Sequence, residues 1–162
     1  MNPLAPPDSH HLEAAEGWIE LGNFSEASEE LAKISPEFHA HSAVLALRIM
    51  LYGKQKQWEP CIPIAESLIA IDPNCPSSWI SRSFALHELK RTQEAFDLLL
   101  QATDRFPDEE TIRYNLACYC AQLGRLEDAK AWLHKAYDIG DETTIKLRAL
   151  DDPDLQPLWR RD

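Results

Sequence analysis

The sequence predicts an all-α protein built as a short right-handed α-α superhelix of helical hairpins. Three observations support this prediction. Apolar residues recur at helical spacing, no alternating run of β-branched residues is present, and residues of one character recur every 34 positions. The 162 residues are 44% hydrophobic and 27% charged, which is the composition of a folded domain.

The 34-residue period is clearest in its columns of small and apolar residues. Steps of 34 give a small residue each time at Ala27, Cys61, Ala95 and Ala129. A second column is apolar throughout: Trp18, Tyr52, Leu86 and Cys120. Small side chains let antiparallel helices approach closely, and large ones fill the remaining space. Each period is therefore predicted to contain two helices joined by a tight turn.

Turn and capping residues predict where these helices start. The hairpin turns are expected at four breaks in the pattern: Gly22-Asn23, Lys56-Gln57, Arg91-Thr92 and Gly124-Arg125. Asn23 is followed three residues later by Glu26, a capping-box-like start of the second helix. Ser35-Pro36 is interpreted as the N-cap and first position of the third helix, and Pro76 as the opening of the fifth.

Two prolines make the fourth helix the least regular of the set. Pro60 fits its first turn, where a missing N–H does no harm. Pro63 lies one turn later and removes a helical hydrogen bond unless the helix starts late.

The C-terminal segment is predicted to cap the end of the stack, because a solenoid otherwise exposes an apolar face. Gly140 is expected to end the eighth helix in the left-handed conformation. Asp141 is expected to cap a ninth helix over 142–150, and Asp152-Pro153 to open a last turn that contains Leu155.

The period and its columns resemble the tetratricopeptide repeat (TPR) family. The third period matches best, through Trp79, Ser83, Leu86, Ala95, Ala102 and Pro107. The tail Leu150–Trp159 resembles the ends of small stand-alone bacterial-type TPR proteins. The resemblance implies a TPR solenoid with an extended or disordered lead at 1–7, four helix-turn-helix repeats within 8–143 (8–41, 42–75, 76–109 and 110–143), and a C-terminal cap segment at 144–162.

The resemblance also implies a concave groove, lined by the first helix of each repeat, as the place of function. Helical phase gives the candidate peptide-binding residues: Glu13, Glu16, Glu20, Ala46, Met50, Ile80, Phe84, His87, Tyr114, Asn115 and Cys118. The groove lacks the cations that clamp a C-terminal carboxylate in some TPR domains. An apolar groove with an acidic end instead suits a protein or peptide with apolar anchors and basic flanks.

Two other interpretations of these residues stay open at this point. The apolar ones can be ordinary packing residues between helices, and the three glutamates an ordinary solvated helix face. A partner could also bind the C-terminal segment rather than the groove.

The function predicted from these residues is a non-catalytic scaffold that binds a peptide or helix of a partner protein. The alternative is a chaperone-like TPR protein that holds apolar segments of a client, similar in size to the type III secretion chaperones. The formal net charge of −11 argues against nucleic acid and against anionic membrane surfaces.

No pattern in the sequence indicates an enzyme. The histidine pairs and the pair Cys118 and Cys120 are spaced too closely along a helix to converge on one metal, and CxxC, HExxH and Gly-rich motifs are absent. We therefore expect no catalytic residue, no metal and no cofactor. The start of the sequence lacks the features of a signal peptide, and no apolar run is long enough to span a bilayer. The expected location is the cytoplasm.

Overall fold

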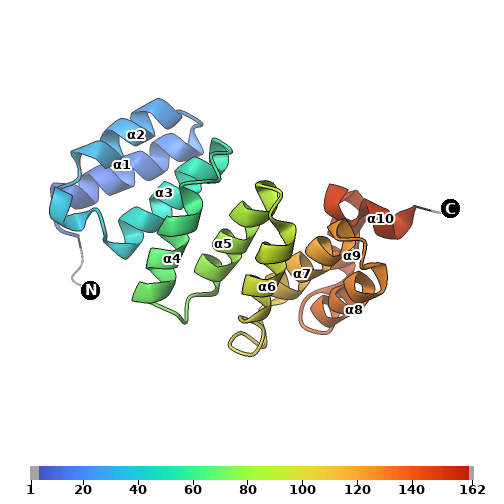
Figure 1. Cartoon of the computed structure of the whole chain (residues 1–162). Helices are drawn as coiled ribbons and strands as arrows, with labels where there is room; N and C mark the ends of the chain where they lie inside the picture. The colour runs from blue at the N-terminus through green and yellow to red at the C-terminus, as the bar shows by residue number, and fades with distance from the viewer. Residues whose placement is uncertain (1–3, 161–162) are drawn as a thin grey trace. The chain divides into compact units, whose positions relative to one another are not determined.

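The structure, a computed structural model, describes residues 4–160, and every regular element in this range is a helix (Figure 1). Contacts divide the chain into two compact units, Met1–Pro73 (unit 1) and Asn74–Asp162 (unit 2). Of the predicted lead 1–7, residues 1–3 lie outside the described residues, and Leu4 packs against the core of unit 1.

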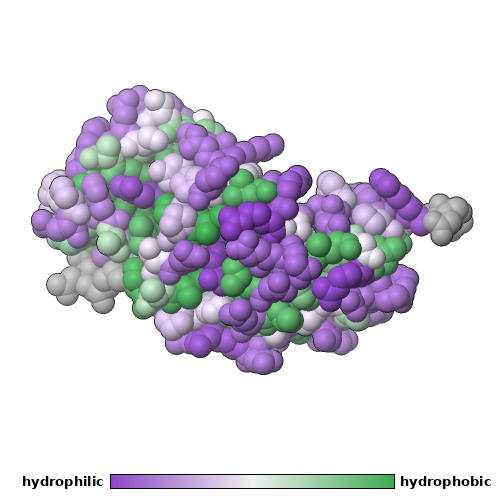
Figure 2. Space-filling view, viewed as in Figure 1, coloured by the Kyte–Doolittle hydropathy of each residue, from purple (hydrophilic) through white to green (hydrophobic). Residues whose placement is uncertain are grey.

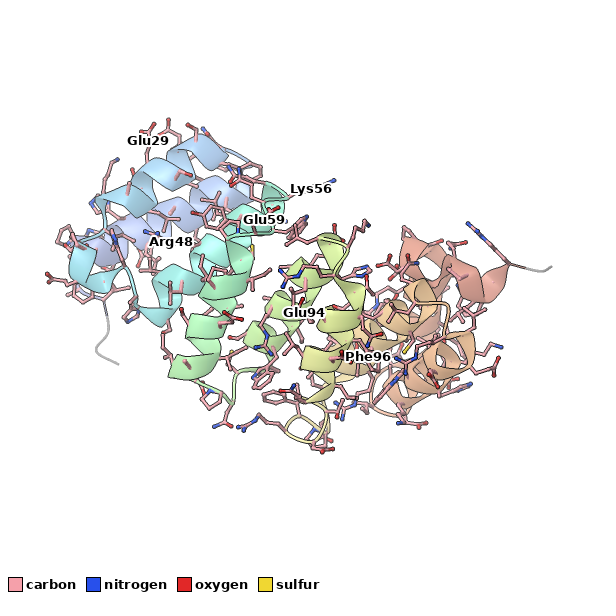
Figure 3. All side chains as sticks on the ribbon, in the orientation of Figure 1. Glu29, Arg48, Lys56, Glu59, Glu94 and Phe96 are labelled. Carbon is pink, nitrogen blue, oxygen red and sulfur yellow. The ribbon has the colours of Figure 1, made fainter. Side chains whose placement is uncertain are left out.

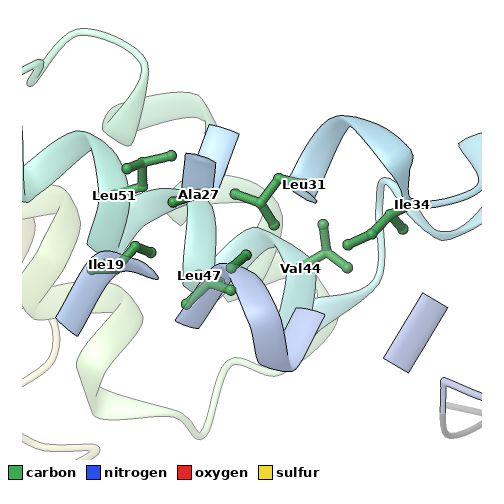
Figure 4. Packing of buried hydrophobic residues seen from close by; sticks show 8 residues of the cluster. Ile19, Ala27, Leu31, Ile34, Val44, Leu47 and Leu51 are labelled. Atoms are coloured by element: carbon green, nitrogen blue, oxygen red, sulfur yellow. The ribbon is translucent and has the colours of Figure 1, made fainter. Parts of the chain in front are cut away.

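Unit 1 consists of two helical hairpins. Its elements are α1 (Asp8–Glu20), α2 (Phe24–Lys33), the 3-10 helix η1 (Pro36–Phe38), α3 (Ser42–Lys54) and α4 (Cys61–Ile71). Each hairpin pairs neighbouring helices, and α3 also packs on α1 and α2. Figure 4 shows Ile19, Leu31 and Val44 in the apolar core that these three helices share.

Unit 2 contains two further hairpins and the C-terminal segment. Its elements are α5 (Pro76–Glu88), α6 (Thr92–Leu100), α7 (Glu110–Gln122), α8 (Leu126–Tyr137), α9 (Glu142–Asp151), the 3-10 helix η2 (Pro153–Leu155) and α10 (Gln156–Trp159). Helix α5 pairs with α6, α7 pairs with α8, and α5 and α7 also pack on each other. The predicted small column is fully or almost fully buried at all four positions: Ala27, Cys61, Ala95 and Ala129.

The four hairpin turns repeat the 34-residue period in their backbone conformation. The residue with positive φ is Gly22 (76°), Lys56 (56°), Lys90 (64°) and Gly124 (75°), in steps of 34. The next residue in each turn donates its N–H to a carbonyl five positions back, as Asn23 does to Trp18 at 2.9 Å and Arg125 to Cys120 at 2.9 Å. This is the Schellman ending of an α-helix. Glycine adopts it freely, whereas the two lysines adopt a conformation that is costly for L-residues.

Two predicted helix ends are wrong. Helix α3 starts at Ser42 rather than at Ser35-Pro36, because Pro36–Phe38 forms a separate 3-10 turn and His41 becomes the N-cap of α3. Gly140 is not left-handed, since Gly22 and Gly124 are the glycines with positive φ among the described residues. A Cβ atom at position 140 would come too close to the ends of the Glu110 and Ile145 side chains, which would have to move aside.

The other predicted ends agree with the structure. Helix α5 opens at Pro76, and the side chain of Asp141 caps α9 by accepting the Thr144 N–H at 2.7 Å. Pro63 lies at the third position of α4, which begins at Cys61. The first four N–H groups of a helix have no helical acceptor, so this proline removes no hydrogen bond.

Candidate functional site: the inner helices of the two units

In unit 1, the predicted groove residues, which we call the unit 1 face, are accessible to solvent. Glu13, Glu16 and Glu20 on α1 and Ala46 and Met50 on α3 are all exposed. The spacing of the three glutamates places them on one side of α1. Among residues 4–160, none of the three is in an ion pair. Like charges at this spacing repel, so a cationic partner would relieve an existing repulsion.

In unit 2, the predicted groove residues divide into two sets. Phe84 is 39% exposed, and Ile80 and Asn115 are half-buried. His87, Tyr114 and Cys118 are buried, with exposed fractions of 4%, 5% and 4%. What buries the second set is the C-terminal segment, which lies against α7 and α8 (Figure 1).

The covering element is a short acidic turn, Asp152-Pro153-Asp154-Leu155, which we call the cap turn. Asp152 Oδ2 accepts the Tyr114 hydroxyl at 2.7 Å and the Cys118 thiol at 3.7 Å. Asp154 Oδ2 accepts His87 Nε2 at 3.0 Å, and its carbonyl accepts Gln122 Nε2 at 2.8 Å. His87, Tyr114, Cys118 and Gln122 therefore form one surface, the unit 2 face, to which the cap turn is bound.

The cap turn is held from its own side as well. Asp152 Oδ1 accepts the Asp154 N–H at 2.9 Å and so fixes the turn. Leu155 is fully buried, and Trp159 Nε1 donates to the Ala149 carbonyl at 2.9 Å. Because Leu155 N also bonds the Asp152 carbonyl at 3.1 Å, the segment keeps a defined turn conformation.

Tyr114 joins the cap turn to helix α9. The Arg148 guanidinium lies 3.7 Å from the centre of the Tyr114 ring, a cation–π contact. Burial, and then the hydrogen bond to the Asp152 carboxylate, raise the pKa of the Tyr114 hydroxyl far above its usual value. The phenol therefore stays protonated and remains a hydrogen-bond donor to Asp152.

Cys118 is unsuited to nucleophilic chemistry in this setting. Burial, and then the charges of Asp152 and Asp154, raise the pKa of its thiol well above the usual range. A reactive cysteine needs a lowered pKa and access to solvent.

Cys118, Asp152 and Asp154 each carry an atom that can ligate a metal ion. These three atoms lie within 4.8 Å of one another. They come from α7 and from the cap turn. The spacing argument made from the sequence treated each helix separately and did not anticipate this convergence. In the structure, hydrogen bonds occupy all three side chains.

A separate apolar cavity of about 410 Å³ opens between α8, α9 and α10. Its lining residues are mainly apolar or aromatic, with two lysines: Lys130, Leu133, His134, Tyr137, Lys146, Leu150, Leu158 and Trp159. Both lysines are bonded to a glutamate on their own helix, Glu127 and Glu142. Elsewhere, polar side chains cover most of the surface visible in Figure 2, and apolar areas are separate and smaller.

Comparisons with known proteins support the helical-hairpin fold. The family model described as "Tetratricopeptide repeat" matches residues 111–139, which span α7 and α8. Three solved structures share the fold of the chain. MamA (residues 41 to the end) from Desulfovibrio magneticus RS-1 has a TM-score of 0.74 at 15% identity, over 90% of this chain and 78% of that one. YrrB, titled a TPR protein with an unusual peptide-binding site, has a TM-score of 0.73 at 16% identity, over 90% and 75%. TTC0263 from Thermus thermophilus has a TM-score of 0.72 at 18% identity, over 94% and 81%.

The chain has the TPR solenoid fold. The resemblance inferred from the 34-residue columns is thereby confirmed. No curated protein matches the chain. TPR solenoids typically serve as non-enzymatic scaffolds for protein–protein interaction.

No helix within residues 4–160 has the length and apolar character needed to cross a bilayer.

Proposed function

We propose that this TPR protein is a non-catalytic scaffold that binds a peptide or helix of a partner protein on the unit 1 face. One observation carries the proposal. In unit 1 the predicted groove residues are open to solvent, whereas in unit 2 the cap turn covers three of them. YrrB is described as having a peptide-binding site, and its likeness in fold supports a peptide site here.

The chemistry of the unit 1 face supports a particular kind of partner. The three glutamates on α1 favour a segment with lysine or arginine flanks. Met50 is 43% exposed, and a flexible thioether side chain adapts to different apolar anchors. The proposed ligand is therefore a peptide with apolar anchors and basic flanks.

A charge-reversal variant tests this proposal. We expect Glu13→Lys, Glu16→Lys and Glu20→Lys together to weaken binding of basic-flanked peptides at least about tenfold, because attraction becomes repulsion. Fluorescence polarisation would be measured with peptides that share the same leucine and phenylalanine anchors but have either lysine or glutamate flanks.

A matched control keeps the same total charge. Glu29→Lys, Glu59→Lys and Glu66→Lys change exposed residues of unit 1 that lie outside α1 and α3, two of which are labelled in Figure 3. This variant should bind as the unchanged chain does. Equal loss in both variants would show a general charge effect and reject the unit 1 face. If the binding affinity depends neither on the charge of the flanks nor on the salt concentration, the result would instead favour the chaperone-like alternative, in which apolar anchors are sufficient.

A further inference from the structure

The unit 2 face has a chemistry opposite to that of the unit 1 face. All four of its side chains act as hydrogen-bond donors toward the cap turn: His87 Nε2, the Tyr114 hydroxyl, the Cys118 thiol and Gln122 Nε2. Three of the four side chains are buried. A donor that is buried without an acceptor costs free energy, so any segment that covers this face must supply acceptors.

The cap turn supplies that cover with very few residues. Two carboxylates and one carbonyl accept the four donors, and Leu155 adds one fully buried apolar anchor. Pro153, between the two aspartates, is exposed to solvent. Apolar anchors in a groove and short acidic motifs are both recurring modes of peptide recognition.

We propose that the unit 2 face is a second binding surface, specific for an acidic Asp-x-Asp-Leu turn of a partner protein, with residues 152–155 as its resident intramolecular ligand. The resident turn shows which chemistry fits: two carboxylates spaced by one residue, followed by leucine. The partner turn takes its place when the C-terminal segment detaches locally. This surface is independent of the unit 1 face and of its basic ligand.

The resident turn also competes with a partner turn for the unit 2 face. A tethered ligand acts at an effective concentration in the millimolar range, so a free peptide competes poorly against it. Weakening the resident turn removes this competition and raises the apparent affinity of the face. The proposal therefore predicts a gain of binding from a change in the tail.

The test uses a labelled peptide with the sequence of residues 150–159 and the full chain. In Asp152→Asn/Asp154→Asn, the peptide should bind at least about tenfold more tightly than to the unchanged chain, as measured by fluorescence polarisation. A peptide in which the residues equivalent to Asp152 and Asp154 are replaced by asparagine should not bind. The control variant Asp138→Asn/Asp151→Asn removes the same charge at two exposed positions and should behave like the unchanged chain.

Native alkylation of Cys118 by iodoacetamide reports whether the face is open in each variant. If Cys118 becomes reactive in a variant and the peptide still does not bind to that variant, the proposal is overturned. If the double variant unfolds, Asp154→Asn is tested alone, because it keeps the Tyr114–Asp152 hydrogen bond. This variant should bind the peptide more tightly than the unchanged chain, by a smaller factor. An unchanged affinity would contradict the proposal. If the chain forms dimers and the peptide dissociates them, the face binds the tail of a second copy. That result would overturn the proposal that it binds a different protein.

Discussion

Replacing Leu155 with alanine should lower the free energy of unfolding of unit 2 by about 2–5 kcal/mol, the usual cost of truncating a fully buried leucine. Leu155 has no exposed surface and is the apolar anchor of the cap turn, whose 3-10 helix η2 packs on α7. Its loss creates a cavity and also loosens the acceptors that cover the donors of the unit 2 face. Urea unfolding followed by circular dichroism measures the change.

Leu147 provides the matched control for this substitution. It belongs to the same C-terminal segment, on α9, but is 62% exposed. Leu147→Ala should change the free energy of unfolding by no more than about 0.5 kcal/mol. If the two alanine variants were equally stable, the C-terminal segment would not be an integral part of unit 2.

Replacing Arg113 with alanine should cost about 3 kcal/mol, because a hydrogen bond to a charged group contributes more than a neutral one. Its guanidinium donates to the carbonyls of Thr103 at 2.8 Å and Glu109 at 3.2 Å, and to that of Phe106. These three bonds hold the connection between α6 and α7. Arg113 is only 8% exposed, and burial lowers the pKa of its guanidinium.

Two measurements separate this role from a general effect of charge. Hydrogen exchange should accelerate in residues 101–109 of the Arg113→Ala variant and stay unchanged in unit 1. Arg105→Ala is the control, since Arg105 is exposed and donates a hydrogen bond to Asn74 Oδ1 at 2.9 Å. It should alter stability by about 0.5 kcal/mol or less. Equal exchange in residues 101–109 of both variants would contradict the account of Arg113.

The repeat pattern made the helices predictable because local forces determine them. The small column at Ala27 and its equivalents determines close helix packing, and the turn positions recur with the same hydrogen bonds. Asp141 was identified correctly because an N-cap bonds within its own helix. The left-handed conformation expected of Gly140 was wrong, because a glycine near a helix end permits positive φ but does not require it.

The candidate site could be predicted only in part. Phase along a helix places His87, Tyr114 and Cys118 on the inner side, but it carries no information about which distant segment covers them. Asp152 and Asp154 were assigned to the cap and not to the groove, because their contacts with α5 and α7 span 32 to 67 positions. The alternation of aspartates in Asp152-Pro153-Asp154 was the one available signal.

The central claim is that the cap turn occupies the unit 2 face, and native alkylation tests it most directly. Cys75 is half-exposed, and a hydrogen bond from Ser77 lowers the pKa of its thiol. Burial and two carboxylates raise the pKa of the Cys118 thiol. With iodoacetamide and mass spectrometry, Cys75 should be modified quickly in the folded chain, and Cys118 should be modified much more slowly until the chain is denatured. Modification of Cys118 at the rate of Cys75 would contradict the claim.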